Sequence, residues 1–133
     1  MNPTTSKPVE SRSLIAGYLR ISWTLSGLDP AEVRLLSVLD CVGSDALDRV
    51  VAGILNKKYQ RILIDLTSLD RVTTAGVEGL MKVSTEIRLR SARLALVGPS
   101  AGVVTFIENL GLTDQFDIYP TVEEAVRGIE AEL

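Results

Sequence analysis

The sequence contains no histidine and only one cysteine, Cys41. The absence of histidine removes the commonest general base and the commonest metal ligand, and with them any Ser-His-Asp or Cys-His arrangement for nucleophilic catalysis. A single cysteine excludes a disulfide within the chain and a cysteine-rich zinc site. We therefore expect no metal and no cofactor, and we expect Cys41 to be a small core residue.

The chain also lacks a block of lysine and arginine. Its formal net charge is −3 and its isoelectric point is about 5.0, so nucleic acid is not an expected partner. No apolar run approaches the ~20 residues that span a bilayer, and the N-terminal residues lack the apolar core of a signal peptide. The expected location is the cytoplasm, without direct insertion into a membrane.

A glycine-rich phosphate-binding turn is missing as well. A nucleotide-binding sheet carries such a turn directly after its first strand, where this chain reads SGLDPAE, and no Walker sequence is present. A small enzyme or nucleotide binder is therefore disfavoured. The 133 residues are enough for one domain with a single core.

Short apolar runs alternate with amphipathic stretches along the chain, and this alternation predicts an α/β fold. The pattern indicates a small mixed sheet of about five strands flanked by about four helices, with an antiparallel pair at one edge. Residues 1–12 are predicted to form a loose tail and residues 13–133 a single domain. Strands are predicted at 14–25, 33–39, 61–66, 94–97 and 116–119. Helices are predicted after the N-caps Ser44, Ser100 and Thr121 and after the pair Thr73-Thr74.

The most informative segment runs from Asp65 to Gly76 and reads DLTSLDRVTTAG. It follows a buried apolar run and opens onto a helical pattern, so a loop carries Thr73 and Thr74 to the start of a helix. The positive end of a helix dipole tolerates a phosphate group there. Either the threonines simply cap the helix, or one hydroxyl is a phosphoacceptor or contacts a kinase.

Two carboxylates end predicted strands. Asp65 ends a central strand, at the edge where open α/β sheets have their functional crevice. It either positions a partner or holds the backbone of the turn at Thr67. Asp40 ends the second strand and is expected to reach the same edge, but no third group supports acid–base catalysis. The predicted partner-binding residues are Asp40, Asp65, Thr67, Thr73, Thr74, Ala75 and Gly76.

These residues resemble the STAS family, the domain shared by sulphate transporters and bacterial anti-sigma factor antagonists. The family segment is a strand, then D-L-S, an apolar residue, D-S-S-G or D-S-T-G, and a helix. Asp65-Leu66-Thr67, Val72 and Gly76 match it without gaps. Further similar segments bring the resemblance to roughly residues 14–131: Leu36–Asp40, Leu94–Val97, Phe106–Leu112 and Tyr119–Ala125.

The resemblance implies a small mixed sheet flanked by helices and a role in partner switching. In that role an anti-sigma factor, a serine/threonine kinase of the histidine-kinase-like ATPase type, binds the unphosphorylated STAS protein. The kinase phosphorylates the serine or threonine just before the motif glycine, and a PP2C-type phosphatase reverses the reaction. STAS domains also occur in signalling assemblies and lipid-transport complexes.

The chain departs from the family motif at the phosphoacceptor. Ala75 precedes Gly76, Thr73 stands at the motif aspartate, and Thr74 matches the first serine of the pair. One interpretation is that Thr74, or with less support Thr73, has become the acceptor. The other is a scaffold or subunit that is not phosphorylated. The sequence leaves the oligomeric state open, a homodimer included.

Overall fold

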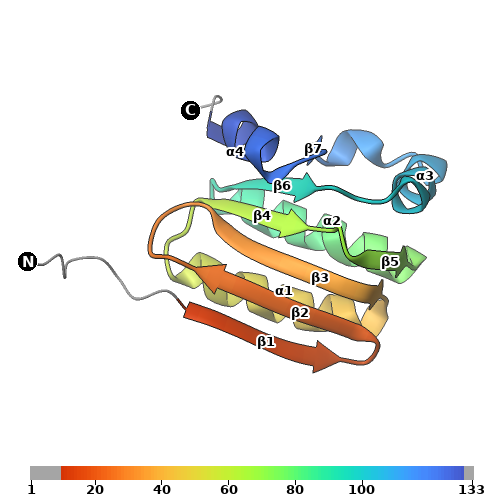
Figure 1. Cartoon of the computed structure of the whole chain (residues 1–133), viewed down its shortest axis with the longest axis horizontal. Helices are drawn as coiled ribbons and strands as arrows, with labels where there is room; N and C mark the ends of the chain where they lie inside the picture. Colours follow the sequence, from red (N-terminus) through yellow and green to blue (C-terminus); the bar gives the residue numbers. More distant parts are fainter. Residues whose placement is uncertain (1–9, 131–133) are drawn as a thin grey trace, which may run out of the picture.

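The computed structural model describes residues 10–130, which form one mixed sheet with helices packed on it (Figure 1). Within this range the elements are β1 (Glu10–Ala16), β2 (Leu19–Leu25), β3 (Ala31–Leu39), α1 (Cys41–Asn56), β4 (Arg61–Asp65), β5 (Leu69–Val72), α2 (Thr74–Leu89), β6 (Arg93–Val97), α3 (Ala101–Asn109), a 3-10 turn (Thr113–Gln115), β7 (Ile118–Tyr119) and α4 (Val122–Glu130).

The sheet order is β1-β2-β3-β4-β6-β7, and β5 pairs with the end of β3. β1, β2 and β3 are antiparallel neighbours, whereas β4, β5, β6 and β7 join by parallel pairing. The predicted mixed α/β fold with its antiparallel pair at one edge is confirmed. The described part of the chain holds seven strands, slightly more than the number expected.

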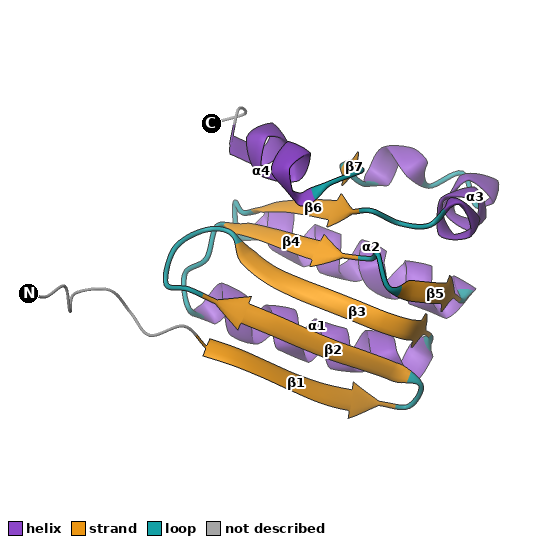
Figure 2. Ribbon diagram, in the orientation of Figure 1, coloured by secondary structure: helices purple, strands orange, loops and turns teal. Residues whose placement is uncertain are grey.

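Helices cover the two faces of the sheet unequally. α1 and α2 lie behind the sheet in Figure 2 and enclose the main core, while α4 lies against β4 and β6. The smaller core under α4 consists of Leu63, Ala95, Val97, Ala125 and Ile129. On the face that α1 and α2 leave uncovered, β2 and β3 expose polar side chains such as Arg20 and Glu32. This division follows from the alternation of buried and exposed residues in the first part of β2 and of β3.

The N-terminal part differs from the expectation in two ways. Residues 14–25 are not one strand, because the chain turns at Gly17 (φ 62°) and forms the β1–β2 hairpin. Glycine reaches a positive φ at no steric cost, which permits so tight a turn. The predicted tail is wrong for residues 10–12, which belong to β1. The rest of that tail, residues 1–9, lies outside the described residues.

The start of α1 also differs. Asp40, not Ser44, is the N-cap: its Oδ1 accepts a hydrogen bond from the Gly43 N–H at 3.0 Å. Ser44 lies one turn inside the helix, is buried, and donates from Oγ to the Ala75 carbonyl oxygen at 3.3 Å. Cys41 was expected in the core, but as the first residue of α1 it is exposed.

The segment predicted as a loop between Thr67 and Gly76 contains a strand. β5 continues the sheet beside the last residues of β3, where the pairing shifts register at Ser37 (φ 78°). The later N-caps are confirmed: Ser100 caps α3 and Thr121 caps α4. Gly111 (φ 71°) follows α3 in the left-handed conformation.

Candidate functional site

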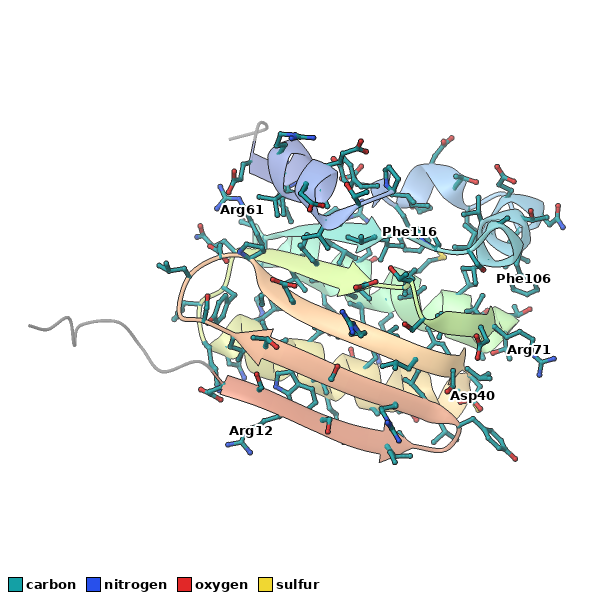
Figure 3. The ribbon with its side chains drawn as sticks, viewed as in Figure 1. Arg12, Asp40, Arg61, Arg71, Phe106 and Phe116 are labelled. Carbon is teal, nitrogen blue, oxygen red and sulfur yellow. The ribbon has the colours of Figure 1, made fainter. Side chains whose placement is uncertain are left out.

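Two helices start close together at one end of the sheet. α1 and α2 pack against each other, and each begins where β3 or β5 ends (Figure 1). The Thr73 N–H donates to the Leu39 carbonyl oxygen at 3.0 Å, so the strand that precedes α1 is bonded directly to the residue that precedes α2. The side chain of Asp40 projects at this end, as do those of Arg71 from β5 and Phe106 from α3 (Figure 3). The sheet thus places both helix N-termini on a common surface.

The Thr73 hydroxyl is used by the fold. Its Oγ1 accepts a hydrogen bond from the Gly76 N–H at 3.1 Å and lies 3.4 Å from the Leu39 carbonyl oxygen, to which it donates. This is the N-cap of α2, so the capping interpretation holds for Thr73. A hydroxyl engaged in both bonds is poorly available to another group.

Thr74 differs from Thr73 in this respect. Both residues are exposed, and Thr74 is the first residue of α2. Within residues 10–130, we find no hydrogen bond made by its hydroxyl. The exposed hydroxyl beside a helix N-terminus that the sequence predicts is therefore present at Thr74.

The next two residues hold α2 close to its neighbours. The Ala75 carbonyl accepts the hydrogen bond from Ser44, which links α2 to α1. At Gly76 a Cβ atom would overlap the Leu39 carbonyl oxygen and would lie 2.8 Å from Cγ2 of Val72. Only glycine permits this approach, so Gly76 sets the distance between α2 and the end of β3.

Asp65 and Thr67 lie apart from the residues at the starts of α1 and α2, which we call the cluster (Asp40, Thr73, Thr74, Ala75 and Gly76). Asp65 pairs in register with Arg34, which precedes Asp40 by six residues, or about 20 Å of strand. The expected meeting of Asp40 and Asp65 at one edge is therefore wrong, because β3 extends well past β4. Asp65 Oδ1 instead accepts bonds from the Thr67 N–H at 2.9 Å and from Thr67 Oγ1 at 2.5 Å. Its Oδ2 lies 3.6 Å from Arg34 Nε. Both carboxylate oxygens of Asp65 therefore contact groups within the chain, as expected if Asp65 holds the backbone of the turn at Thr67.

Exposed apolar side chains that the sequence analysis did not single out adjoin the cluster. Tyr18 in the β1–β2 turn is 78% exposed, and Val42 in the first turn of α1 is 51% exposed. A Cβ on Gly17 would lie 3.3 Å from Cγ1 of Val42, so the hairpin turn touches the start of α1. The surface around Asp40 is thus partly apolar. The sequence signal that could have located this exposed surface is Gly17, because a glycine between two strand-like segments indicates a hairpin turn.

Residues 10–130 hold no group of three histidine, cysteine, aspartate or glutamate side chains placed to bind a metal ion. None of the helices described combines the length and apolar character needed to cross a membrane. The surface at the starts of α1 and α2 presents hydroxyl, carboxylate and apolar groups.

Solved structures share this fold. An anti-sigma factor antagonist from Mycobacterium paratuberculosis is similar with a TM-score of 0.67 and 16% identity over 94% of this chain and 98% of that chain. The anti-sigma factor antagonist SpoIIAA in its unphosphorylated form gives 0.66 and 17% over 92% and 97%, and SpoIIAA is also known in a phosphorylated form. The murine anion transporter Slc26a9 gives 0.66 and 21% over 76% of this chain but only 18% of the transporter.

Curated protein sequences gave no match. The identities to the solved structures are low, and they establish the common fold only. The family model of the STAS domain matches residues 25–125, which is most of the chain and includes both helix starts. The chain belongs to the STAS domain family.

Proposed function

We propose that the protein is a non-enzymatic interaction module of the anti-sigma factor antagonist kind, which binds an anti-sigma factor in a partner-switching pathway. The observation that carries the proposal is the difference between the two threonines at the start of α2. The Thr73 hydroxyl accepts a hydrogen bond from the Gly76 N–H and donates to the Leu39 carbonyl oxygen. Thr74 is an exposed residue on the same surface, and within the described residues its hydroxyl takes no part in such bonds. Thr74 is the residue whose modification would alter a partner surface without breaking a bond of the fold.

The partner we propose is a serine/threonine kinase of the histidine-kinase-like ATPase type. Proteins of this fold include anti-sigma factor antagonists, one of them known in unphosphorylated and phosphorylated forms, which supports such a partner. The binding surface would include Asp40, Thr74 and Ala75 together with the apolar groups of Tyr18 and Val42. A PP2C-type phosphatase would remove the phosphate.

Phosphorylation of Thr74 would act through charge. A phosphate adds about −1.5 to −2 charges at neutral pH. It would stand near Asp40 and on the same helical face as Glu78, one turn further along α2. The start of the helix tolerates the added charge, so the fold remains intact. An acidic partner surface would be repelled, and an apolar partner surface would have to desolvate the phosphate, so the partner would dissociate.

The test is intact-mass analysis of the protein purified from its native cell under several growth and stress conditions. We expect one phosphate group on the wild-type chain, retained in Thr73→Ser, which keeps the capping hydroxyl, and lost in Thr74→Ala. Absence of any phosphate under every condition would exclude the switch at this residue. A phosphate that survives in Thr74→Ala would assign the acceptor elsewhere.

A constitutive STAS scaffold is the second candidate. Ala75 occupies the position before Gly76 and has no hydroxyl, which favours a protein that is never phosphorylated. Such a protein would be a subunit of a signalling or lipid-transport complex. Stable co-purification of a large complex whose composition is the same for wild-type and Thr74→Ala would support the scaffold over the switch.

A further inference from the structure

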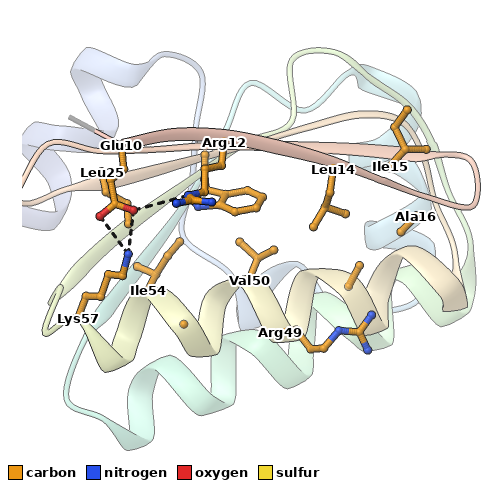
Figure 4. Close-up of a pocket in the computed structure, with 13 residues that line it drawn as sticks. Glu10, Arg12, Leu14, Ile15, Ala16, Leu25, Arg49, Val50, Ile54 and Lys57 are labelled. Carbon is orange, nitrogen blue, oxygen red and sulfur yellow. Dashed lines mark hydrogen bonds and ion pairs between the residues drawn. The ribbon is translucent and has the colours of Figure 1, made fainter. Parts of the chain in front are cut away.

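A groove of about 520 Å³ lies between the edge strand β1 and helix α1, away from the start of α2 (Figure 4). Its floor and walls are mainly apolar. The apolar lining includes Leu14, Ala16, Trp23, Leu25, Val50 and Ile54. A volume of this size is within the range of small-molecule sites, and the apolar lining suits an aliphatic group.

Two features keep the groove open. Within residues 10–130, β1 is the last strand of the sheet, and no further strand in this range pairs with its outer edge. On the opposite wall, α1 presents Gly53, and a Cβ atom built there meets no heavy atom within 4 Å. Glycine is unfavourable inside a helix by ~0.5–1 kcal/mol relative to alanine. Its presence in the last turn of α1, which ends at Asn56, leaves space that a side chain would otherwise fill.

The rim of the groove is basic. Arg12, Arg49 and Lys57 line it together with a single acidic residue, Glu10. Glu10 is already engaged: its carboxylate lies 2.9 Å from Lys57 Nζ and 3.8 Å from Arg12 Nε. The hydrogen bond from Lys57 lowers the pKa of Glu10, so that carboxylate is ionised at neutral pH. Three positive charges therefore face one negative charge.

Arg49 is the basic group of this rim that stands apart from Glu10. Among residues 10–130, no carboxylate oxygen lies within 4.0 Å of its guanidinium. An apolar groove with an unneutralised cation at its edge is complementary to a molecule with one aliphatic chain and one negative end. We infer that the β1–α1 groove binds an unbranched aliphatic carboxylate, with the chain against Trp23, Val50 and Ile54 and the head group on Arg49.

Trp23 supplies a direct readout, because it lines the groove and is the only tryptophan of the chain. The full-length protein is titrated with dodecanoate below the concentration at which dodecanoate forms micelles, while tryptophan emission is recorded. The same titration is followed by calorimetry, so that a silent fluorophore does not hide binding. We expect a saturable change, and weaker binding of dodecanol and dodecyltrimethylammonium, which lack the negative end.

Two variants locate the site. Gly53→Leu fills the groove and is expected to raise the dissociation constant at least about tenfold. Gly102→Leu is the matched control, since Gly102 is also an exposed helical glycine, and a Cβ atom there would lie 3.9 Å from Ser100 Oγ, an ordinary van der Waals contact. Arg49→Gln is expected to weaken dodecanoate about two- to fivefold, the effect of an exposed charge pair, and to leave dodecanol unchanged.

Several outcomes would overturn the inference. These are no saturable signal by either method, equal binding by Gly53→Leu and wild-type, or equal affinity for dodecanoate and dodecyltrimethylammonium. A signal that depends on protein concentration instead of dodecanoate would assign the groove to a second copy of the chain, and would also overturn it. The inference does not depend on phosphorylation of Thr74, because the groove and the start of α2 involve different residues.

Discussion

The Thr73 N–H donates to the Leu39 carbonyl oxygen at 3.0 Å, and this bond joins the residue that caps α2 to the last residue of β3. Asp40 follows Leu39 directly and caps α1. The two caps are therefore fixed with respect to each other by one backbone contact. A partner that binds the start of α2 would therefore also contact the start of α1.

Thr73 and Thr74 are expected to differ in their effect on stability. Thr73→Ala removes the acceptor for the Gly76 N–H and should lower the free energy of unfolding by about 1 kcal/mol. Thr74→Ala removes a solvent-exposed hydroxyl and should change it by no more than about 0.5 kcal/mol. Urea unfolding at neutral pH measures both.

Thr73→Ser is the control for this comparison, because it keeps a capping hydroxyl and should stay close to wild-type. Equal losses in Thr73→Ala and Thr74→Ala would contradict the assignment of Thr73 as the cap.

Gly76 should be intolerant of any side chain. A Cβ there overlaps the Leu39 carbonyl oxygen, a backbone atom that cannot move aside, so Gly76→Ala should lower the free energy of unfolding by about 1–3 kcal/mol. Gly53→Ala is the matched control within a helix, because its Cβ would enter open space. It should raise the free energy of unfolding by ~0.5–1 kcal/mol. Denaturant unfolding of the two variants should therefore give opposite signs, and a destabilised Gly53→Ala would contradict the open space at α1.

The raised pKa of Glu86 makes the free energy of unfolding depend on pH. Among residues 10–130, no donor reaches the buried atoms Glu86 Oε1 and Asp48 Oδ1. A hydrogen bond to the Asp48 side chain, which requires a proton shared between the two carboxyl groups, raises the pKa of Glu86, as do burial and the Asp48 charge, while Lys82 and Arg90 partly offset the rise. The folded protein then holds this proton more tightly than the unfolded chain does. The resulting stabilisation is fully present below the ordinary pKa of 4.5 and is lost as the pH rises through the raised value.

Glu86→Gln should remove that loss, because an amide can donate to Asp48 without a proton from solvent. The variant should gain stability relative to wild-type as the pH rises from about 4 towards 7. Urea unfolding at a series of pH values measures the difference. Glu78→Gln, an exposed glutamate of the same helix, is the control and should show less of this trend. A Glu86→Gln variant whose relative stability falls with rising pH would contradict the shared proton.

The sequence predicted the fold class and the start of the helix that follows Thr73 and Thr74 because both depend on local patterns. Alternation in β2 and the helical spacing after Thr74 were readable directly, and so was the helix start. β1 was missed because its α1-facing residues include Glu10 and Arg12, which line the groove and hide the apolar alternation. An edge strand that faces an open groove shows only a weak alternation of apolar and polar residues, because its inward-facing side chains need not be apolar.

The errors around the site have tertiary causes. Asp40 and Ser44 are both good N-cap residues, and only the packing of Ser44 against Ala75 shows that it lies inside α1. β5 consists of LDRV, which has little strand character of its own, and it is held by pairing with the far end of β3. Because β3 extends beyond β4, Asp65 and Asp40 separate, a fact that depends on strand lengths the sequence did not resolve.

The apolar groups beside Asp40 predict which exposed residues a partner contacts. Tyr18 and Val42 are exposed where the hairpin turn meets α1, and burial of such side chains in an interface stabilises binding. In a pull-down from the native cell, Tyr18→Ser should reduce the amount of bound partner about tenfold, equivalent to ~1.4 kcal/mol, without a change in the free energy of unfolding. Leu28→Ser is the matched control, since Leu28 is 75% exposed but follows the opposite end of β2. Of the two substituted residues, only Tyr18 lies beside Asp40. Equal losses of bound partner in the two variants would therefore mean that the partner does not bind the surface beside Asp40.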